Sequence, residues 1–189
     1  MVVAFAALWA VMMLLGFGTH PLAVAAMVVL LGYAVFLFFW TARTMRAVRA
    51  LPDGPVTEAD IRSQKRIGRS FGVTFGVEMV LIMAAAVLLG NSVIGGPDFI
   101  APVIALIVGV HFYPLGALFR TRVHAVLATP VVLVAVVSIV VIARGTFVQP
   151  MIGICCLVTS VCVALMATYI LRWCSENLAS HTCPRGRWT

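Results

Sequence analysis

Two side chains that can exchange a proton lie inside long apolar stretches of the sequence, Glu78 and His111. At 1.5 Å per residue, Glu78 would lie roughly 12–14 Å beyond Arg69, where its apolar stretch begins. An ionisable group at that depth is costly and usually lines a pathway or a cavity. A carboxyl group beside an imidazole can pass a proton near neutral pH. We therefore predict a catalytic role in proton transfer for Glu78 and His111, with buried structural hydrogen bonding as the alternative.

The elements that position these side chains are membrane helices. Hydrophobic residues make up 63% of the chain and charged residues 10%, whereas soluble domains are about half apolar and a quarter charged. Residues 1–17 and 130–143 carry no charge, and such runs are typical of membrane spans rather than of buried core helices. The predicted fold class is all-α, a transmembrane bundle of about six helices that forms a single domain at residues 1–171. Its spans are predicted at 2–17, 22–40, 69–90, 99–119, 125–142 and 150–171.

Lys and Arg residues gather on one side of these spans. They flank the longest loop, predicted at 41–68, and recur at 120–122 and in the tail predicted at 172–189, with Arg144 as the exception. Because cytoplasmic loops carry the excess of Lys and Arg, both termini are predicted to be cytoplasmic in a multi-pass protein of the cell (inner) membrane. We attribute the net charge of +7 to orientation and to contact with anionic membrane lipids, and expect no nucleic-acid partner.

The third and fourth spans are antiparallel and joined by a short loop, so they are expected to be neighbours. Glu78 and His111 would then lie at nearly the same depth. Pro114 follows His111 inside the same span, where it removes a backbone hydrogen bond and leaves the carbonyl of Val110 without a partner. Because interrupted helices in membranes tend to line cavities, this part of the span is predicted to face one.

Polar and aromatic residues accompany the pair along both spans. Arg66, Ser70 and Thr74 share an i, i+4 stripe with Glu78, and this stripe could guide water or protons to the carboxyl group. The occupant expected at this site is a hydrophobic small molecule or an ion. The candidate substrate-binding residues are Thr74, Phe75, Phe112, Tyr113 and Arg120.

Three glycines open the third span at a spacing of four residues, Gly68, Gly72 and Gly76. A doubled G-x-x-x-G pattern lets a neighbouring helix approach closely. We predict tight packing inside the bundle at these glycines, with a homodimer formed through the same face as the alternative.

No cofactor and no metal site are predicted. Three of the five cysteines lie in an apolar run, where Cys behaves as a small hydrophobe. The spacing of Cys174, His181 and Cys183 matches no strong zinc pattern. The sequence contains no phosphate-binding loop and no H-E-x-x-H or C-x-x-C motif, which argues against soluble nucleotide chemistry.

The stretch Gly109-Val-His111-Phe-Tyr-Pro114-Leu-Gly-Ala-Leu-Phe119-Arg120 resembles a segment, commonly G-x-H-F-x-P-L-x-x-L-F, of small uncharacterised bacterial membrane proteins. The resemblance covers roughly residues 60–145 and includes a Glu after a glycine-rich start, as Glu78 stands here. It implies six spans and importance for Glu78 and His111, but no activity. A looser likeness is to small polytopic terpene cyclases, in which Glu78 would be the acid and Phe71, Phe75, Phe112 and Tyr113 the aromatic walls. Their second acidic residue has no clear counterpart.

Three functions fit these observations. The first is a small proton-coupled transporter of an unknown solute that uses Glu78 and His111. The second is a membrane-embedded enzyme acting on a lipid or prenyl substrate, with Glu78 as general acid. The third is a membrane subunit of a larger transport complex. An enzyme should work in detergent, a transporter should need a sealed membrane, and a subunit should co-purify with a partner.

Overall fold

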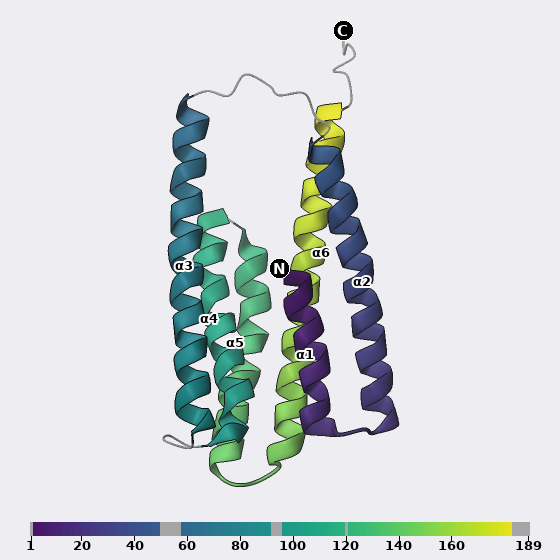
Figure 1. Ribbon diagram of the computed structural model, residues 1–189, viewed down its shortest axis with the longest axis vertical. Helices are drawn as coiled ribbons and strands as arrows, with labels where there is room; N and C mark the ends of the chain where they lie inside the picture. The colour runs from purple at the N-terminus through teal and green to yellow at the C-terminus, as the bar shows by residue number, and fades with distance from the viewer. Residues whose placement is uncertain (1, 50–57, 92–95, 120, 183–189) are drawn as a thin grey trace.

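In the computed structural model, the described part of the chain folds into six α-helices and one short 3₁₀ helix (Figure 1). The structure describes residues 2–49, 58–91, 96–119 and 121–182. These residues form no strand, so the predicted all-α fold class is confirmed. The elements are α1 (Val2–Phe17), α2 (Pro21–Arg49), α3 (Glu58–Gly90), η1 (Pro97–Phe99), α4 (Ile100–Phe119), α5 (Arg122–Ala143) and α6 (Val148–Thr182).

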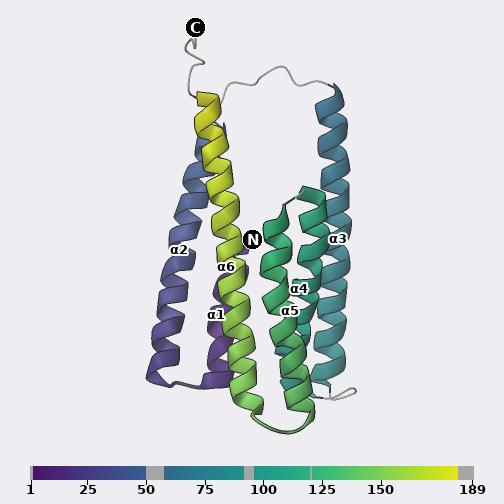
Figure 2. The same cartoon turned by 180° about the vertical axis from the view of Figure 1, so that it is seen from behind.

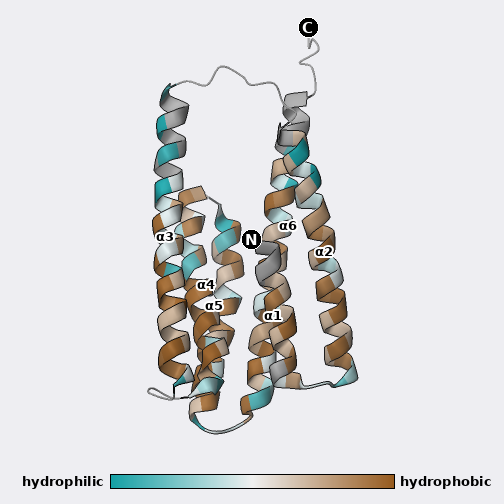
Figure 3. Cartoon of the chain, in the orientation of Figure 1, coloured by the Kyte–Doolittle hydropathy of each residue, from teal (hydrophilic) through white to brown (hydrophobic). Residues whose placement is uncertain are grey.

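Five of these helices, α2 to α6, are long and apolar enough to cross a membrane. Hydrophobic residues cover most of their surface, while hydrophilic residues gather at the upper end of α3 (Figure 3). The remaining helix, α1, has 16 residues, fewer than the roughly twenty that a full crossing needs. It lies against α6 and α2 inside the bundle. The number of spans and the side on which the termini lie stay predictions.

The helices form two groups that meet at α6. One group contains α1, α2 and α6, and the other contains α3, α4 and α5. Seen from behind, α6 lies between α2 and α5 (Figure 2). At the edge of the second group, α3 packs mainly on α4, which leaves much of the surface of α3 uncovered.

Three helices extend beyond α4 and α5 at one end of the molecule, namely α2, α3 and α6 (Figure 1). The segment predicted as a loop at 41–68 is therefore helical at residues 41–49 and 58–68. Residues 50–57 lie outside the described residues. Helix α3 begins within the predicted loop, at Glu58, and runs unbroken into the third span. Helix α6 likewise continues through Thr182, past the start of the predicted tail.

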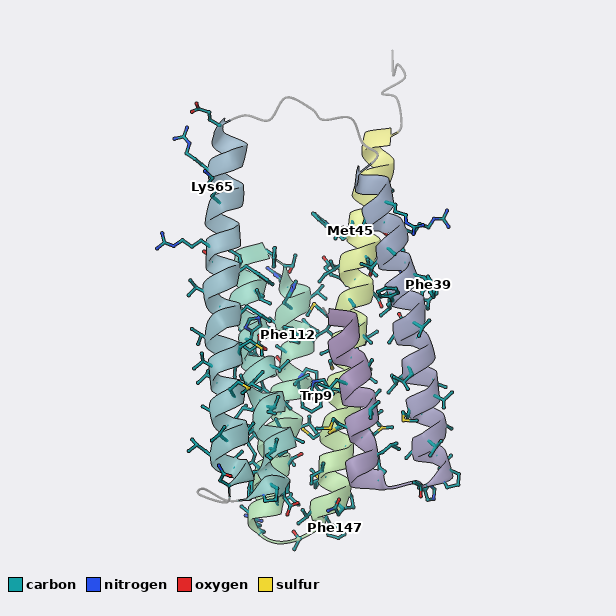
Figure 4. All side chains as sticks on the ribbon, viewed as in Figure 1. Trp9, Phe39, Met45, Lys65, Phe112 and Phe147 are labelled. Carbon is teal, nitrogen blue, oxygen red and sulfur yellow. The ribbon has the colours of Figure 1, made fainter. Side chains whose placement is uncertain are left out.

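The core lies where α1, α4, α5 and α6 meet. Trp9 projects from α1 into the centre of the bundle (Figure 4) and packs with Met13 against small residues of the neighbouring helices. Ala105 on α4, Ala135 on α5 and Cys155 on α6 are fully buried there. Small side chains allow helix backbones to approach closely, which is how membrane helices pack tightly without a strong hydrophobic driving force.

The predicted packing of Gly68, Gly72 and Gly76 inside the bundle is wrong. All three glycines are exposed, and a Cβ atom added to any of them would meet nothing within 4 Å among the described residues. The physical reason is the position of α3, whose main neighbour is α4. Among the described side chains of α3, Glu78 and Leu89 are the buried ones, so the glycines lie on another face. The alternative, a homodimer through these glycines, is untested.

Candidate functional site

Glu78 and His111 meet between α3 and α4. One carboxylate oxygen of Glu78, Oε2, lies 3.3 Å from Nδ1 of His111, and each side chain is only 9% exposed. The geometric prediction that the two residues lie at the same depth on neighbouring antiparallel helices is confirmed.

The orientation of His111 follows from how α4 packs on α5. Gly109 brings the two helices so close that a Cβ atom on it would lie 2.8 Å from Cγ2 of Val132. Ala105 and Val108 are buried on the same part of α4. This small-residue face of α4 packs on α5. His111 is two residues, or about half a turn, from Gly109, so it points in another direction and faces α3.

A groove with a volume of about 490 Å³ runs along this helix pair. Two helices supply all of its lining residues in the described part of the chain. From α3 come Val73, Thr74, Val77, Glu78 and Leu81, and from α4 come Leu106, Ile107, Val110, His111 and Pro114.

The groove opens sideways, toward the surroundings of the bundle rather than toward its core. Val73 is 60% exposed, Val77 55% and Val110 52%, although all three line it. In a membrane these exposed aliphatic side chains would face lipid tails, whereas Glu78 and His111 are covered at the floor. The predicted association of Pro114 with a cavity is confirmed, since Pro114 is a lining residue.

The acid and the base of the groove can share one proton without creating net charge. A protonated Glu78 beside a neutral His111, and an ionised Glu78 beside a protonated His111, both sum to zero. Removing that proton or adding another leaves a net charge between apolar walls, which is unfavourable. The third polar lining residue, Thr74, donates its hydroxyl hydrogen to the carbonyl of Ser70 at 2.9 Å. Chemically, the site can accept, hold and release a proton.

The aromatic residues predicted to bind substrate are not brought to this groove. Phe75 stacks on Phe71 along α3, with ring centroids 6.3 Å apart. Phe112 packs against the buried cluster that contains Ala6 and Val163. The Tyr113 hydroxyl lies 3.0 Å from Oγ1 of Thr129 on α5. Thr74 does line the groove, and Arg120 lies outside the described residues.

Sequence reasoning missed the aliphatic walls of the groove. Val73, Val77 and Leu81 recur at every fourth position on α3, and this i, i+4 spacing was the available signal. It also missed His124, a buried histidine of α5 that bonds with Thr121 and stacks on Phe119. Within the part of the chain that the structure describes, no group of three or more His, Cys, Asp and Glu residues could hold a metal ion.

Comparison with known proteins identifies a family but no activity. No curated protein and no solved structure matches the chain. A model of a family of unknown function (DUF7010) matches residues 56–167. The matched region contains both Glu78 and His111 and runs from the start of α3 into α6. Because the match covers more than half of the sequence, the chain belongs to this family of unknown function, DUF7010.

Proposed function

We propose that this protein is an integral membrane protein that couples proton binding at the Glu78–His111 pair to the movement of an apolar solute held in the groove between α3 and α4. One observation carries the proposal: an acid and a base lie 3.3 Å apart, nearly covered, in an otherwise apolar groove. A pair built only for structure would gain nothing from an aliphatic groove that opens to the surroundings.

Coupling follows from the charge of the pair. An apolar solute that fills the groove excludes water, and this disfavours the charged states of the pair more than the state with one shared proton. Solute binding therefore favours uptake or release of a proton until the pair is neutral. By thermodynamic linkage, the protonation state must change solute affinity by the same factor.

The edge position of α3 supports movement. This helix rests mainly on α4, and few of its side chains are buried. A helix with one principal neighbour can shift along it without repacking the core of α1, α4, α5 and α6. Such a shift would separate Glu78 from His111 and change the shape of the groove at the same time.

The test is proton movement in liposomes made from a natural polar lipid extract and loaded with a pH-sensitive dye. An imposed pH gradient should drive proton flux through the wild-type protein, and Glu78→Gln should abolish it while the variant remains folded. The matched control is Glu58→Gln, because Glu58 is an exposed acid on the same helix that pairs with Arg62. Equal flux in the wild type and in Glu78→Gln would overturn the proposal.

A second candidate is a membrane enzyme that acts on a lipid, with Glu78 as general acid. The sideways opening of the groove favours it, because a lipid could enter directly from the bilayer. Prenyl cyclisation gains no support, since aromatic faces that would stabilise cationic intermediates are missing from the lining. Activity on a lipid substrate in detergent, without a sealed membrane, would favour this enzyme over the transporter.

A further inference from the structure

One stripe of α3 carries two kinds of side chain in succession. Lys65 and Arg69 are followed at every fourth position by Val73, Val77 and Leu81. Both cations are exposed, and the three aliphatic residues line the groove. Residues at i and i+4 lie on the same side of a helix, one turn apart. Because each step of four residues also turns by about 40° around the helix, Arg69 lies one turn before Val73 and Lys65 lies one turn further away and further around. The groove therefore has a basic patch, defined here as Lys65 and Arg69, beyond one end and to one side of it.

The basic patch lies where the apolar part of α3 begins, and this is the expected boundary of the membrane. The stretch of α3 that could cross a membrane is Gly68–Gly90, so Arg69 stands at its very start. The neighbouring cation Arg62 pairs with Glu58 at 3.6 Å. Among the described residues, neither Lys65 nor Arg69 has an acidic partner within 4.0 Å. Exposed cations at a membrane surface attract anionic lipid headgroups.

The groove also has the depth of one lipid leaflet. The rise from Val73 to Leu81 is about 12 Å at 1.5 Å per residue. One leaflet contributes about half of a hydrocarbon core that is roughly 30 Å thick. A chain anchored at Arg69 would thus run along the whole groove and end near the middle of the bilayer.

We propose that the groove binds an acyl chain of an anionic phospholipid whose phosphate group lies on Lys65 and Arg69. The chain follows Val73, Val77 and Leu81 and covers the Glu78–His111 pair. This inference rests on the proposed function, because it names the apolar molecule whose position is linked to the proton. The charge of the patch selects the headgroup, and the aliphatic walls accept the chain.

The headgroup is tested by native mass spectrometry of the purified full-length protein with added phosphatidylglycerol or phosphatidylcholine of equal chain length. Wild-type protein should bind phosphatidylglycerol more tightly. Because a cation near a membrane surface contributes about five-fold in affinity, the double variant Lys65→Gln/Arg69→Gln should lose roughly 25-fold. The control Arg43→Gln/Arg46→Gln removes the same charge from exposed positions at the same end of the bundle, on α2, and should retain this preference.

The groove is tested with Val77→Trp, which fills the space beside Glu78 and should weaken binding of both lipids. Val80→Trp is the matched control, since Val80 is 68% exposed on the same helix and does not line the groove.

Equal binding of the two lipids, or binding that is unchanged in the double variant or in Val77→Trp, would overturn the inference. If the protein prefers phosphatidylglycerol but Glu78→Gln conducts protons normally, only the proposed function is wrong. If Glu78→Gln loses proton flux but the protein binds both lipids equally, only this inference is wrong.

Discussion

Gly16 and Gly153 bring α1 and α6 into backbone contact. A Cβ atom placed on Gly16 would lie 2.0 Å from the backbone nitrogen of Gly153, and one on Gly153 would lie 2.7 Å from Cδ2 of Phe17. At Gly16 the nearest atoms belong to the backbone of α6, so no side chain larger than hydrogen fits there without moving a helix. The 16-residue helix α1 is therefore fixed to α6, the longest helix among the described residues.

Gly16→Ala is expected to destabilise the protein. The added methyl group meets backbone atoms of α6, which cannot rotate away as a side chain could, and overpacking of this kind costs about 1–3 kcal/mol or more. Thermal unfolding in detergent should show a lower Tm. Gly32→Ala is the control, because a Cβ atom at Gly32 meets no described residue within 4 Å, and Ala is favoured over Gly inside a helix by about 0.5–1 kcal/mol. An equal Tm for the two variants would contradict the close approach at Gly16.

Gly72→Leu should leave the Tm of the monomer unchanged or slightly raised. Gly72 is exposed on α3, and a Cβ atom there meets none of the residues that the structure describes within 4 Å. The measurement is Tm together with the molar mass of the detergent-solubilised protein. A fall in mass from dimer to monomer in this variant would mean that a second copy packs on Gly68, Gly72 and Gly76. A large drop in the Tm of a monomeric protein would show that these glycines have a packing role after all.

The meeting of Glu78 with His111 could be predicted because it depends on local features. Two apolar stretches joined by a short loop must run antiparallel, and equal distances from the loop place two residues at equal depth. Such predictions need only helical rise and the order of segments along the chain.

The neighbours of each helix could not be predicted in this way. Gly16 and Gly153 are far apart in sequence, and nothing local distinguishes them from the exposed glycines of α3. Phe112 follows His111 directly, yet it packs into the cluster with Ala6 while His111 faces Glu78. A sequence shows where small or aromatic residues lie, but their partners depend on which helices pack together.

Ser160→Ala should weaken the attachment of α1 to α6. The Ser160 hydroxyl is buried and donates a hydrogen bond of 2.9 Å to the backbone carbonyl of Ala6. Its removal should cost about 0.5–1.5 kcal/mol in the free energy of unfolding. Ser175→Ala is the control, because Ser175 lies on the same helix and bonds to the local carbonyl of Arg172 near the surface. Denaturant unfolding in detergent measures both, and a larger loss in the control would contradict the interhelical role of Ser160.

The Glu78–His111 contact should appear as an energetic coupling between the two residues. Glu78→Gln and His111→Gln each leave the other side chain in an apolar groove without its acid–base partner, so each should lower the free energy of unfolding. In the double variant two amides can bond to each other, and its loss should be smaller than the sum by about 0.5–3 kcal/mol. Proton flux should be lost in both single variants and be no lower in the double variant, because residues that act as a unit are not additive. Glu78→Gln combined with Thr129→Val is the control cycle, since Thr129 bonds to Tyr113 rather than to the pair. Additive losses in both cycles would mean that Glu78 and His111 do not act together.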